Sequence, residues 1–184
     1  MAVVWLGVGA NLAPEKDLPA GLAHLREIFS VLAVSPCYRS PAMGFDGPDF
    51  INLVVVIETD LGVAELSQAC KQIERDFGRP DDAIKYSSRH LDLDILMVDQ
   101  RSGNVDGIAL PRDDVKRFAF VVRPLLDLWP EAVCPGTGAP IQSYWPGVSD
   151  QPLQRTEIAG VEPQAFSTEV TQALAAVSSS ALTH

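Results

Sequence analysis

The sequence predicts an α+β fold in which two helices pack on one face of an antiparallel sheet. Three observations indicate this fold. Apolar runs rich in β-branched residues mark the strands, two stretches carry an apolar stripe at helical spacing, and these segments follow the order strand, helix, strand, strand, helix, strand. That order, with additions, is typical of a ferredoxin-like βαββαβ sandwich.

The first half of the chain supplies a strand, a helix and two more strands. Residues 2–10 are continuously apolar and end in a Gly-Ala-Asn turn, which is typical of a buried strand. Apolar residues at helical spacing over 18–32 predict an amphipathic helix, with Asp17 as a candidate cap and Pro19 in the first turn. A short strand is expected within 32–40, a loop at 41–48 and a β-branched strand at 49–61.

The second half is expected to supply a helix, a strand, a hairpin and a short helix. Asp60 is expected to cap a helix whose apolar stripe runs from Val63 to Phe77 and which ends at Gly78. A polar loop at 78–90 precedes a strand at 91–98, a hairpin turn is expected at 101–107, and a loop and short helix at 109–131. Residues 175–184 indicate a frayed tail. The expected division is therefore a domain over 1–146 and a partly flexible extension over 147–184.

Composition narrows the class of protein. The chain has 184 residues, of which 47% are hydrophobic and 21% charged, as expected for a soluble domain with a full core. Its net charge of -10 argues against a general nucleic-acid binder. The cysteines Cys37, Cys70 and Cys134 are odd in number and form no CxxC, so neither a zinc site nor a disulfide framework is indicated. Without a leader or an apolar segment of spanning length, a cytoplasmic protein is expected.

One predicted strand carries a candidate metal-binding pair of aspartates. In residues 89–96, Leu91, Leu93 and Ile95 alternate with polar residues, so Asp92 and Asp94 share the opposite face, roughly 6–7 Å apart. Magnesium is often bound by one or two carboxylates together with substrate phosphates. For an isolated Asp-x-Asp, two solvated aspartates are the commoner explanation. Here, however, basic residues that can bind phosphate lie just upstream.

Five motifs together resemble the 6-hydroxymethyl-7,8-dihydropterin pyrophosphokinase family over about residues 2–145. In chain order they are GANL (9–12), YRSPAMGFDGPDFIN (38–52), IERDFGR (73–79), RHLDLDIL (89–96) and LPRDDVKRFAFVVRPL (110–125). The resemblance implies the fold reached above. It also implies transfer of pyrophosphate from ATP to the pterin hydroxymethyl oxygen, giving AMP, in folate biosynthesis. Two Mg²⁺ ions are the implied cofactors and ATP the co-substrate. We expect a monomer with no nucleic-acid or membrane partner.

The resemblance also implies roles for particular residues. The catalytic residues would be Arg79, Arg89, Asp92 and Asp94, with both aspartates binding metal. The ATP-binding residues would be Lys71, Glu74, Lys85, Arg89 and Arg112. The pterin-binding residues would be Ser40, Pro41, Met43, Phe50, Asn52 and Phe120. Two aromatic rings suit a flat heterocycle, and an amide suits its hydrogen-bonding edge.

The chain departs from the family pattern mainly around the nucleotide. KYSSR (85–89) stands where the family usually has RWGPR, so that Tyr86 replaces a tryptophan. Arg112 replaces a histidine, Phe118 an arginine, and Lys71 a glutamine. The loop that is commonly basic carries Asp81 and Asp82.

Two other functions remain open from the sequence. The first is a divergent paralogue that binds pterin or nucleotide with altered or no catalysis. The second is a metal-dependent nucleotide-binding protein that binds no pterin. A protein that binds no pterin gives no role to Phe50, Asn52 and Phe120, so this second function is the least favoured. The retained Asp92–Asp94 pair favours an enzyme, because a simple binding module does not need a metal-dependent strand face.

Overall fold

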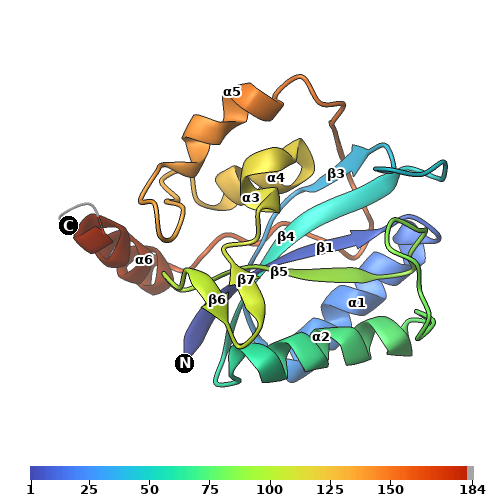
Figure 1. Ribbon diagram of the computed structural model, residues 1–184, viewed down its shortest axis with the longest axis horizontal. Coiled ribbons are helices and arrows are strands. Elements are labelled where there is room, and N and C mark those ends of the chain that lie inside the picture. The colour runs from blue at the N-terminus through green and yellow to red at the C-terminus, as the bar shows by residue number, and fades with distance from the viewer. Residues whose placement is uncertain (182–184) are drawn as a thin grey trace.

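A six-stranded antiparallel sheet forms the centre of the computed structural model, which describes residues 1–181 (Figure 1). Its strands are β1 (Ala2–Ala10), β2 (Ser30–Val34), β3 (Cys37–Ser40), β4 (Phe50–Thr59), β5 (Asp92–Val98) and β8 (Gln154–Thr156). The order is β5-β1-β4-β3-β8, with β2 also paired to β4, and every pairing is antiparallel. Central β1 and β4 thus separate the edge strands, which confirms the predicted ferredoxin-like α+β fold.

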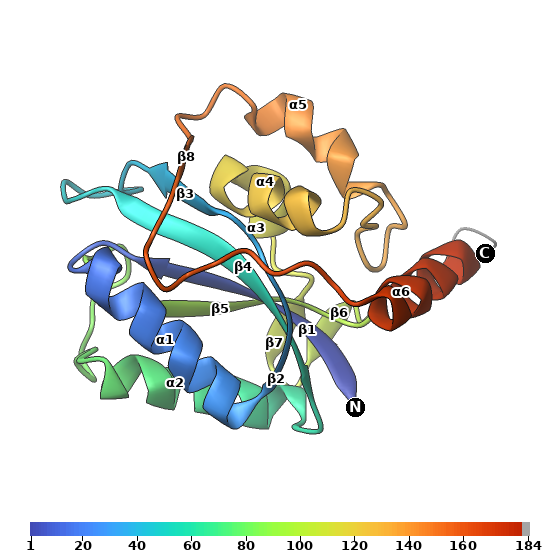
Figure 2. The ribbon, with the colours of Figure 1, turned by 180° about the vertical axis from the view of Figure 1, so that it is seen from behind.

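Helices α1 (Pro14–Ile28) and α2 (Val63–Asp76) cover one face of this sheet (Figures 1 and 2). Their apolar stripes pack in one buried cluster with the inward side chains of β5. The predicted stripes are confirmed, including Cys70, which is buried in α2, except at the end of the first: α1 ends at Ile28, and Leu32 lies in β2. All three cysteines are free and buried, as expected without a disulfide framework.

Both predicted helix caps are wrong. Helix α1 begins at Pro14 after Ala13, so Asp17 lies inside the helix, where its carboxylate Oδ2 is 2.7 Å from His90 Nδ1. Helix α2 begins after Gly62, whose N–H donates to Glu65 Oε2 at 2.9 Å. Because Glu65 already satisfies this end of the helix, Asp60 is left outside it and pairs with the N-terminal ammonium at 3.3 Å.

The other face of the sheet is covered by the second half of the chain. A hairpin of β6 (Gly103–Val105) and β7 (Ile108–Leu110) leads to α3 (Asp114–Arg117) and α4 (Ala119–Leu128), followed by a 3₁₀ turn (Ile141–Tyr144) and α5 (Trp145–Val148). The predicted hairpin and short helix are confirmed. Val122 and Leu125 of α4 pack in a second buried cluster with Val54 of β4 and Leu96 of β5. This second cluster stops short of the start of β5, so Asp92 and Asp94 border open space.

Helix α6 (Thr168–Ala181) differs from the expected frayed tail. Its partly buried Leu174 and Ala175, together with Phe166, pack against the second cluster, which includes Trp5 and Trp129. The serines and alanines of this segment obscure its helical periodicity. The last three residues of the predicted tail lie outside the described part of the chain.

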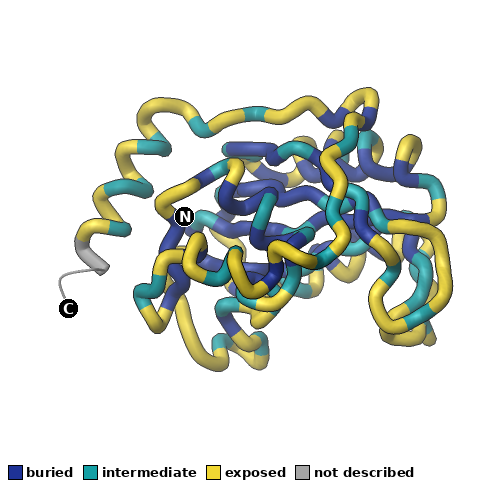
Figure 3. The backbone as a smooth tube through the Cα atoms, turned by 90° about the horizontal axis from the view of Figure 1, so that it is seen from above, coloured by how far each residue is buried: buried dark blue, intermediate teal, exposed yellow. Residues whose placement is uncertain are grey.

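Buried residues are concentrated in the strands, and exposed residues in the outer loops and along α6 (Figure 3). Among residues 1–181, no helix is both long and apolar enough to cross a membrane.

Candidate active site

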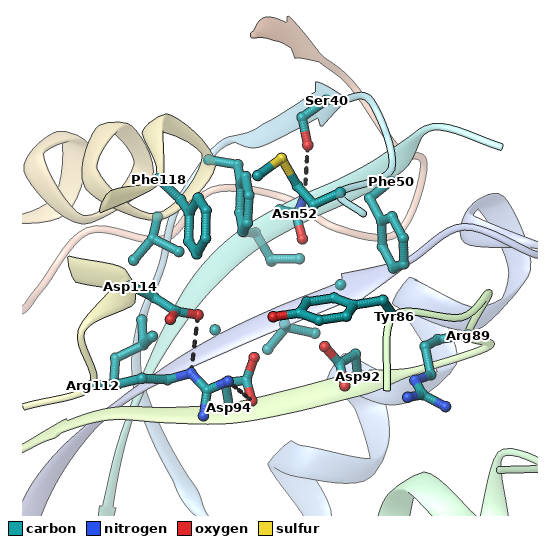
Figure 4. A pocket seen from close by; sticks show the side chains of 18 of the residues that line it. Ser40, Phe50, Asn52, Tyr86, Arg89, Asp92, Asp94, Arg112, Asp114 and Phe118 are labelled. Atoms are coloured by element: carbon teal, nitrogen blue, oxygen red, sulfur yellow. Dashed lines mark hydrogen bonds and ion pairs between the residues drawn. The ribbon is translucent and has the colours of Figure 1, made fainter. Parts of the chain in front are cut away.

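A cavity of about 250 Å³ opens on the sheet face that α1 and α2 leave free (Figure 4). Strands β1, β4 and β5 form its floor, and its walls come from the loops at 41–49 and 77–91 and from the chain around α3 and α4. All six predicted pterin-binding residues line it: Ser40, Pro41, Met43, Phe50, Asn52 and Phe120. So do six predicted catalytic or ATP-binding residues: Arg79, Lys85, Arg89, Asp92, Asp94 and Arg112.

The upper part of this cavity is aromatic and contains one oriented amide. Asn52 Nδ2 donates to Ser40 Oγ at 3.2 Å, which fixes the amide against β3. A Cβ atom at Gly9 would lie only 2.5 Å from Asn52 Oδ1, so the glycine provides the room that this orientation needs. The ring of Phe120 stacks on Phe118, with centroids 5.0 Å apart and planes 11° apart. The cavity therefore presents a flat, preformed wall beside a hydrogen-bonding amide.

The lower part carries the carboxylate pair. Asp92 and Asp94 side chains are 35% and 31% exposed, while Leu93 between them is buried, which confirms the predicted alternation. Burial and, after it, the charge of Asp92 raise the pKa of Asp94 to about 7, whereas Arg112 opposes the shift. The site therefore favours a bound cation.

These oxygen donors fit Mg²⁺. Within residues 1–181, no group of three or more His, Cys, Asp or Glu side chains is placed to hold a metal ion. A site with only two carboxylates suits a cation that takes its remaining ligands from water and substrate phosphates.

Two arginines flank the carboxylate pair, and each also contacts an outer carboxylate. Arg79 donates to Glu74 in a short hydrogen bond, and its Nη1 lies 3.8 Å from Asp92 Oδ1. Arg112 Nη2 lies 3.3 Å from Asp94 Oδ1, and Arg112 Nε donates to Asp114 Oδ2 at 2.9 Å. Positive charge is thus placed on both sides of Asp92 and Asp94.

A second cavity of about 410 Å³ adjoins the first along α2 and β5. Arg79, Asp94 and Arg112 line both cavities, so the two meet at the charged residues. The predicted ATP-binding residues Lys71 and Glu74 line the second cavity rather than the first. Among the described residues, aromatic rings thus line the first cavity and none lines the second, while Arg79, Asp94 and Arg112 lie where the two cavities meet.

Two predicted site residues are already engaged within the protein. Glu74 is buried; its Oε1 accepts the Leu93 N–H at 2.8 Å and its other oxygen accepts the Arg79 bond. Burial raises the pKa of Glu74, and the Leu93 hydrogen bond opposes that shift. Arg89 is also buried, and its Nη2 donates to the Ile84 carbonyl at 2.9 Å. Glu74 thus anchors Arg79 and β5, and Arg89 anchors its own loop.

The sequence prediction missed two residues of this site. Asp114 lies at the start of α3 and orients Arg112. Tyr86 was identified only as a replacement, but its ring lies over the cavity between Phe50 and the aspartates (Figure 4). The ring also contacts the other loop, because a Cβ atom at Gly44 would lie 3.4 Å from Tyr86 Cγ. No local sequence pattern relates residues 44 and 86, so this contact could be predicted only from information that links distant positions.

Asn11, in the GANL turn, has no role predicted from the sequence, but it joins the two loops that form the cavity walls. It is 3% exposed, and its Oδ1 accepts the Arg89 N–H at 2.7 Å. Its Nδ2 donates to the Pro48 carbonyl and to Ser88 Oγ, both at 3.1 Å. One buried side chain at the end of β1 therefore fixes both loops.

Replacing Asn11 with alanine is expected to lower the free energy of unfolding by about 1–3 kcal/mol, because buried partners lose their hydrogen bonds. Amide exchange should accelerate in both loops, 41–49 and 78–91. Asn104→Ala in the exposed β6–β7 hairpin, where Asn104 Oδ1 accepts only the Gly107 N–H, is the matched control. Equal exchange rates in wild type and Asn11→Ala would contradict this role for Asn11.

Comparisons with known proteins agree with the geometry. Residues 5–130 match the family model of 7,8-dihydro-6-hydroxymethylpterin-pyrophosphokinase. The chain is 34% identical over 136 residues to the 2-amino-4-hydroxy-6-hydroxymethyldihydropteridine pyrophosphokinase of Pseudomonas aeruginosa, covering 72% of this chain and 83% of that protein. Against the protein of the same name from Aquifex aeolicus, identity is 28% over 148 residues, covering 79% and 92%. It is also 33% identical over 144 residues to the folic acid synthesis protein fol1 of Schizosaccharomyces pombe, covering 76% of this chain but only 20% of that longer protein.

Proposed function

The chain belongs to the 7,8-dihydro-6-hydroxymethylpterin-pyrophosphokinase family, and from this premise we propose that it transfers pyrophosphate from ATP to the hydroxyl of 6-hydroxymethyl-7,8-dihydropterin. AMP is the second product, and the step belongs to folate biosynthesis. One observation carries the proposal: the six predicted pterin-binding residues and the two aspartates line a single cavity, which adjoins a second cavity lined by Lys71 and Glu74.

The pterin ring is assigned to the aromatic cavity, between Phe50 and Phe120. Offset stacking on two rings binds a flat heterocycle through area and geometry. Asn52 can pair with the donor and acceptor edge of the ring, because Ser40 already fixes the amide. This placement directs the hydroxymethyl group toward Asp92 and Asp94.

ATP is assigned to the second cavity, with its phosphates at the junction. Lys71 lines this cavity, and Glu74 holds Arg79 at its edge. Arg79 and Arg112 face the phosphate chain from two sides, and Lys85 and Arg89 approach from the loop at 78–91. Cations on several sides stabilise the charge that develops during transfer, for which positioning matters more than covalent chemistry.

Asp92 and Asp94 are assigned to the metal. Bound Mg²⁺ would neutralise phosphate charge and orient the reacting groups. The two aspartates would hold it on a strand whose register is fixed by pairing with β1. The hydroxymethyl oxygen attacks the β-phosphorus and forms a new P–O bond, and its hydroxyl proton is released to solvent. The bond from the β-phosphorus to the oxygen shared with the α-phosphate breaks, which releases AMP.

The test is an assay with ATP, Mg²⁺ and the reduced hydroxymethylpterin. AMP formed in equal amount to the pterin diphosphate supports pyrophosphoryl transfer. ADP would indicate a different kinase reaction. Tight pterin binding without either nucleotide product would identify the divergent binding paralogue instead.

Replacing Phe50 with alanine is expected to weaken pterin binding by about 1–3 kcal/mol, the cost of losing a stacking aromatic in comparable sites. Calorimetry with the pterin and, separately, with an ATP analogue checks it. The ATP analogue is the internal control, because Phe50 lines only the first cavity. Unchanged pterin affinity would remove Phe50 from the binding site.

We also propose the wider features of the enzyme. Residues 1–146 form the catalytic domain and 147–184 an extension, since all residues lining the two cavities lie between Gly7 and Val121. Two Mg²⁺ ions bind with ATP, and the protein works in the cytoplasm as a monomer without a nucleic-acid partner. Metal stoichiometry, sedimentation and cell fractionation test these points.

A further inference from the structure

Arg112 lies where the two cavities meet and contacts two carboxylates at once. Its Nη2 is 3.3 Å from Asp94 Oδ1, and its Nε donates to Asp114 Oδ2 at 2.9 Å. Its own backbone N–H donates to the Leu96 carbonyl at 2.8 Å, which fixes the base of the side chain to β5. The guanidinium can therefore move only by rotation of its side chain, which is 45% exposed.

The contact with Asp94 competes with the metal proposed for the same carboxylate. A divalent ion at Asp94 and a guanidinium 3.3 Å from its Oδ1 are like charges at close range, and they repel. Asp114 offers the guanidinium a second anchor that the metal does not need. Its side chain is only 21% exposed, so it is held beside the cavity rather than free in solvent.

We propose that Arg112 is a movable counter-cation of the metal site and that Asp114 is the positioning residue that controls it. Without metal, the guanidinium neutralises Asp94. When metal and nucleotide bind, it leaves Asp94, stays on Asp114 and faces the phosphate chain. This inference rests on the proposed function, because it requires a metal at Asp94.

The opposite side of the site provides a contrast. Arg79 is held by buried Glu74, and its nearest approach to Asp92 is 3.8 Å. Arg79 therefore already pairs more closely with Glu74 than with Asp92. Competition between arginine and metal is therefore expected mainly at Asp94.

The test uses Mn²⁺ as a calorimetric probe of the full chain without nucleotide. Arg112→Gln should bind Mn²⁺ about two- to fivefold more tightly than wild type, the range expected for a partly exposed ion pair. Asp114→Asn should bind it more weakly by a similar factor, because Arg112 then pairs with Asp94 alone. In the double variant, Asp114→Asn should have no further effect. Arg117→Gln, which removes an exposed pair with Asp113 outside both cavities, should match wild type.

A second arm adds a non-hydrolysable ATP analogue with Mg²⁺. Arg112→Gln should bind the analogue more weakly, opposite in direction to its gain in Mn²⁺ affinity. A general loss of structure cannot produce opposite changes. If Arg112→Gln fails to fold, Arg112→Lys replaces it, since lysine cannot bridge both carboxylates and should also bind Mn²⁺ more tightly.

The outcomes separate this inference from the proposed function. If wild type binds no Mn²⁺ even with the analogue, the metal site itself is wrong. If wild type binds Mn²⁺ and Arg112→Gln binds it equally, the inference is overturned. Additive effects in the double variant also overturn it, because independent charges give additive free energies.

Discussion

Replacing Asp94 with alanine is expected to abolish Mg²⁺-dependent ATP binding and to lower turnover by at least about 10²–10³-fold, the typical loss when a group that stabilises developing charge is removed. Asp92→Ala should behave alike. Both side chains point away from the core that Leu93 and Ile95 help to form, so the fold should persist. Calorimetry with ATP and Mg²⁺ measures the loss.

Asp113→Ala is the control for this change, because Asp113 is an exposed aspartate that lines neither cavity. It should leave ATP binding intact. ATP affinity equal to wild type in Asp92→Ala or Asp94→Ala would reject the metal assignment.

The pKa of Asp94 gives the same substitution a second readout. Burial and Asp92 raise this pKa from 3.8 to about 7 in the metal-free protein. A raised pKa means that the group contributes stability below pH 4 and that this contribution is lost as the pH rises through about 7. Asp94→Asn should therefore melt higher than wild type at pH 8 without metal, and the difference should shrink toward pH 4. Added Mg²⁺ with ATP should stabilise wild type but not the variant.

Local periodicity was enough to predict β1, β4, β5, the helices α1 and α2 and the face that carries the aspartates, but it did not predict β8 or α6. Alternation in residues 89–96 determined which side chains enter the core, since strand side chains point to opposite faces in turn. The helix caps could not be predicted in this way. Asp60 and Gly62 are both acceptable caps by residue type, and only the hydrogen bond from Gly62 to Glu65 distinguishes them.

The cavity walls depend on contacts between residues far apart in the chain. Asn11 bonds to the backbone of Arg89 across 78 positions, which no local pattern encodes. The pterin residues were identified from a family resemblance, because Ser40 and Phe120 have no sequence relation that places them together. Asp114 and Arg112 are close in sequence, but their relation to Asp94 appears only when the segment after β7 is placed against β5, where the Arg112 N–H donates to the Leu96 carbonyl.

Phe118 shows how a departure from the family pattern can be accommodated. At the position of a common family arginine, its ring stacks on Phe120 and supports the wall assigned to the pterin. The position of a positive charge is thus taken by a ring that supports the apolar part of the cavity. Under the proposed function, Arg79 and Arg112 would then carry more of the phosphate charge.

Replacing Arg79 with alanine is therefore expected to lower turnover by about 10²–10³-fold with little change in pterin affinity. Arg79 lines both cavities at the start of the loop, and Glu74 holds its guanidinium 3.8 Å from Asp92. Arg79→Lys should recover only part of the rate, because an ammonium cannot contact Glu74 and phosphate with the same planar geometry. Steady-state kinetics with both substrates saturating, together with pterin calorimetry, separates turnover from binding.

Removing the two acidic charges in the same loop should have the opposite effect on turnover. Asp81 lines the second cavity, where its charge opposes Arg79 and the phosphates. Asp81→Asn/Asp82→Asn should raise turnover, while Asp76→Asn, at an exposed end of α2 where Asp76 accepts from Gln72, should not. If the double variant is no faster with Mg²⁺ and ATP saturating, the pair is simply a solvated turn. Any slow turnover would then have to arise from the replaced nucleotide contacts at Arg112 and Phe118, where the next substitutions belong.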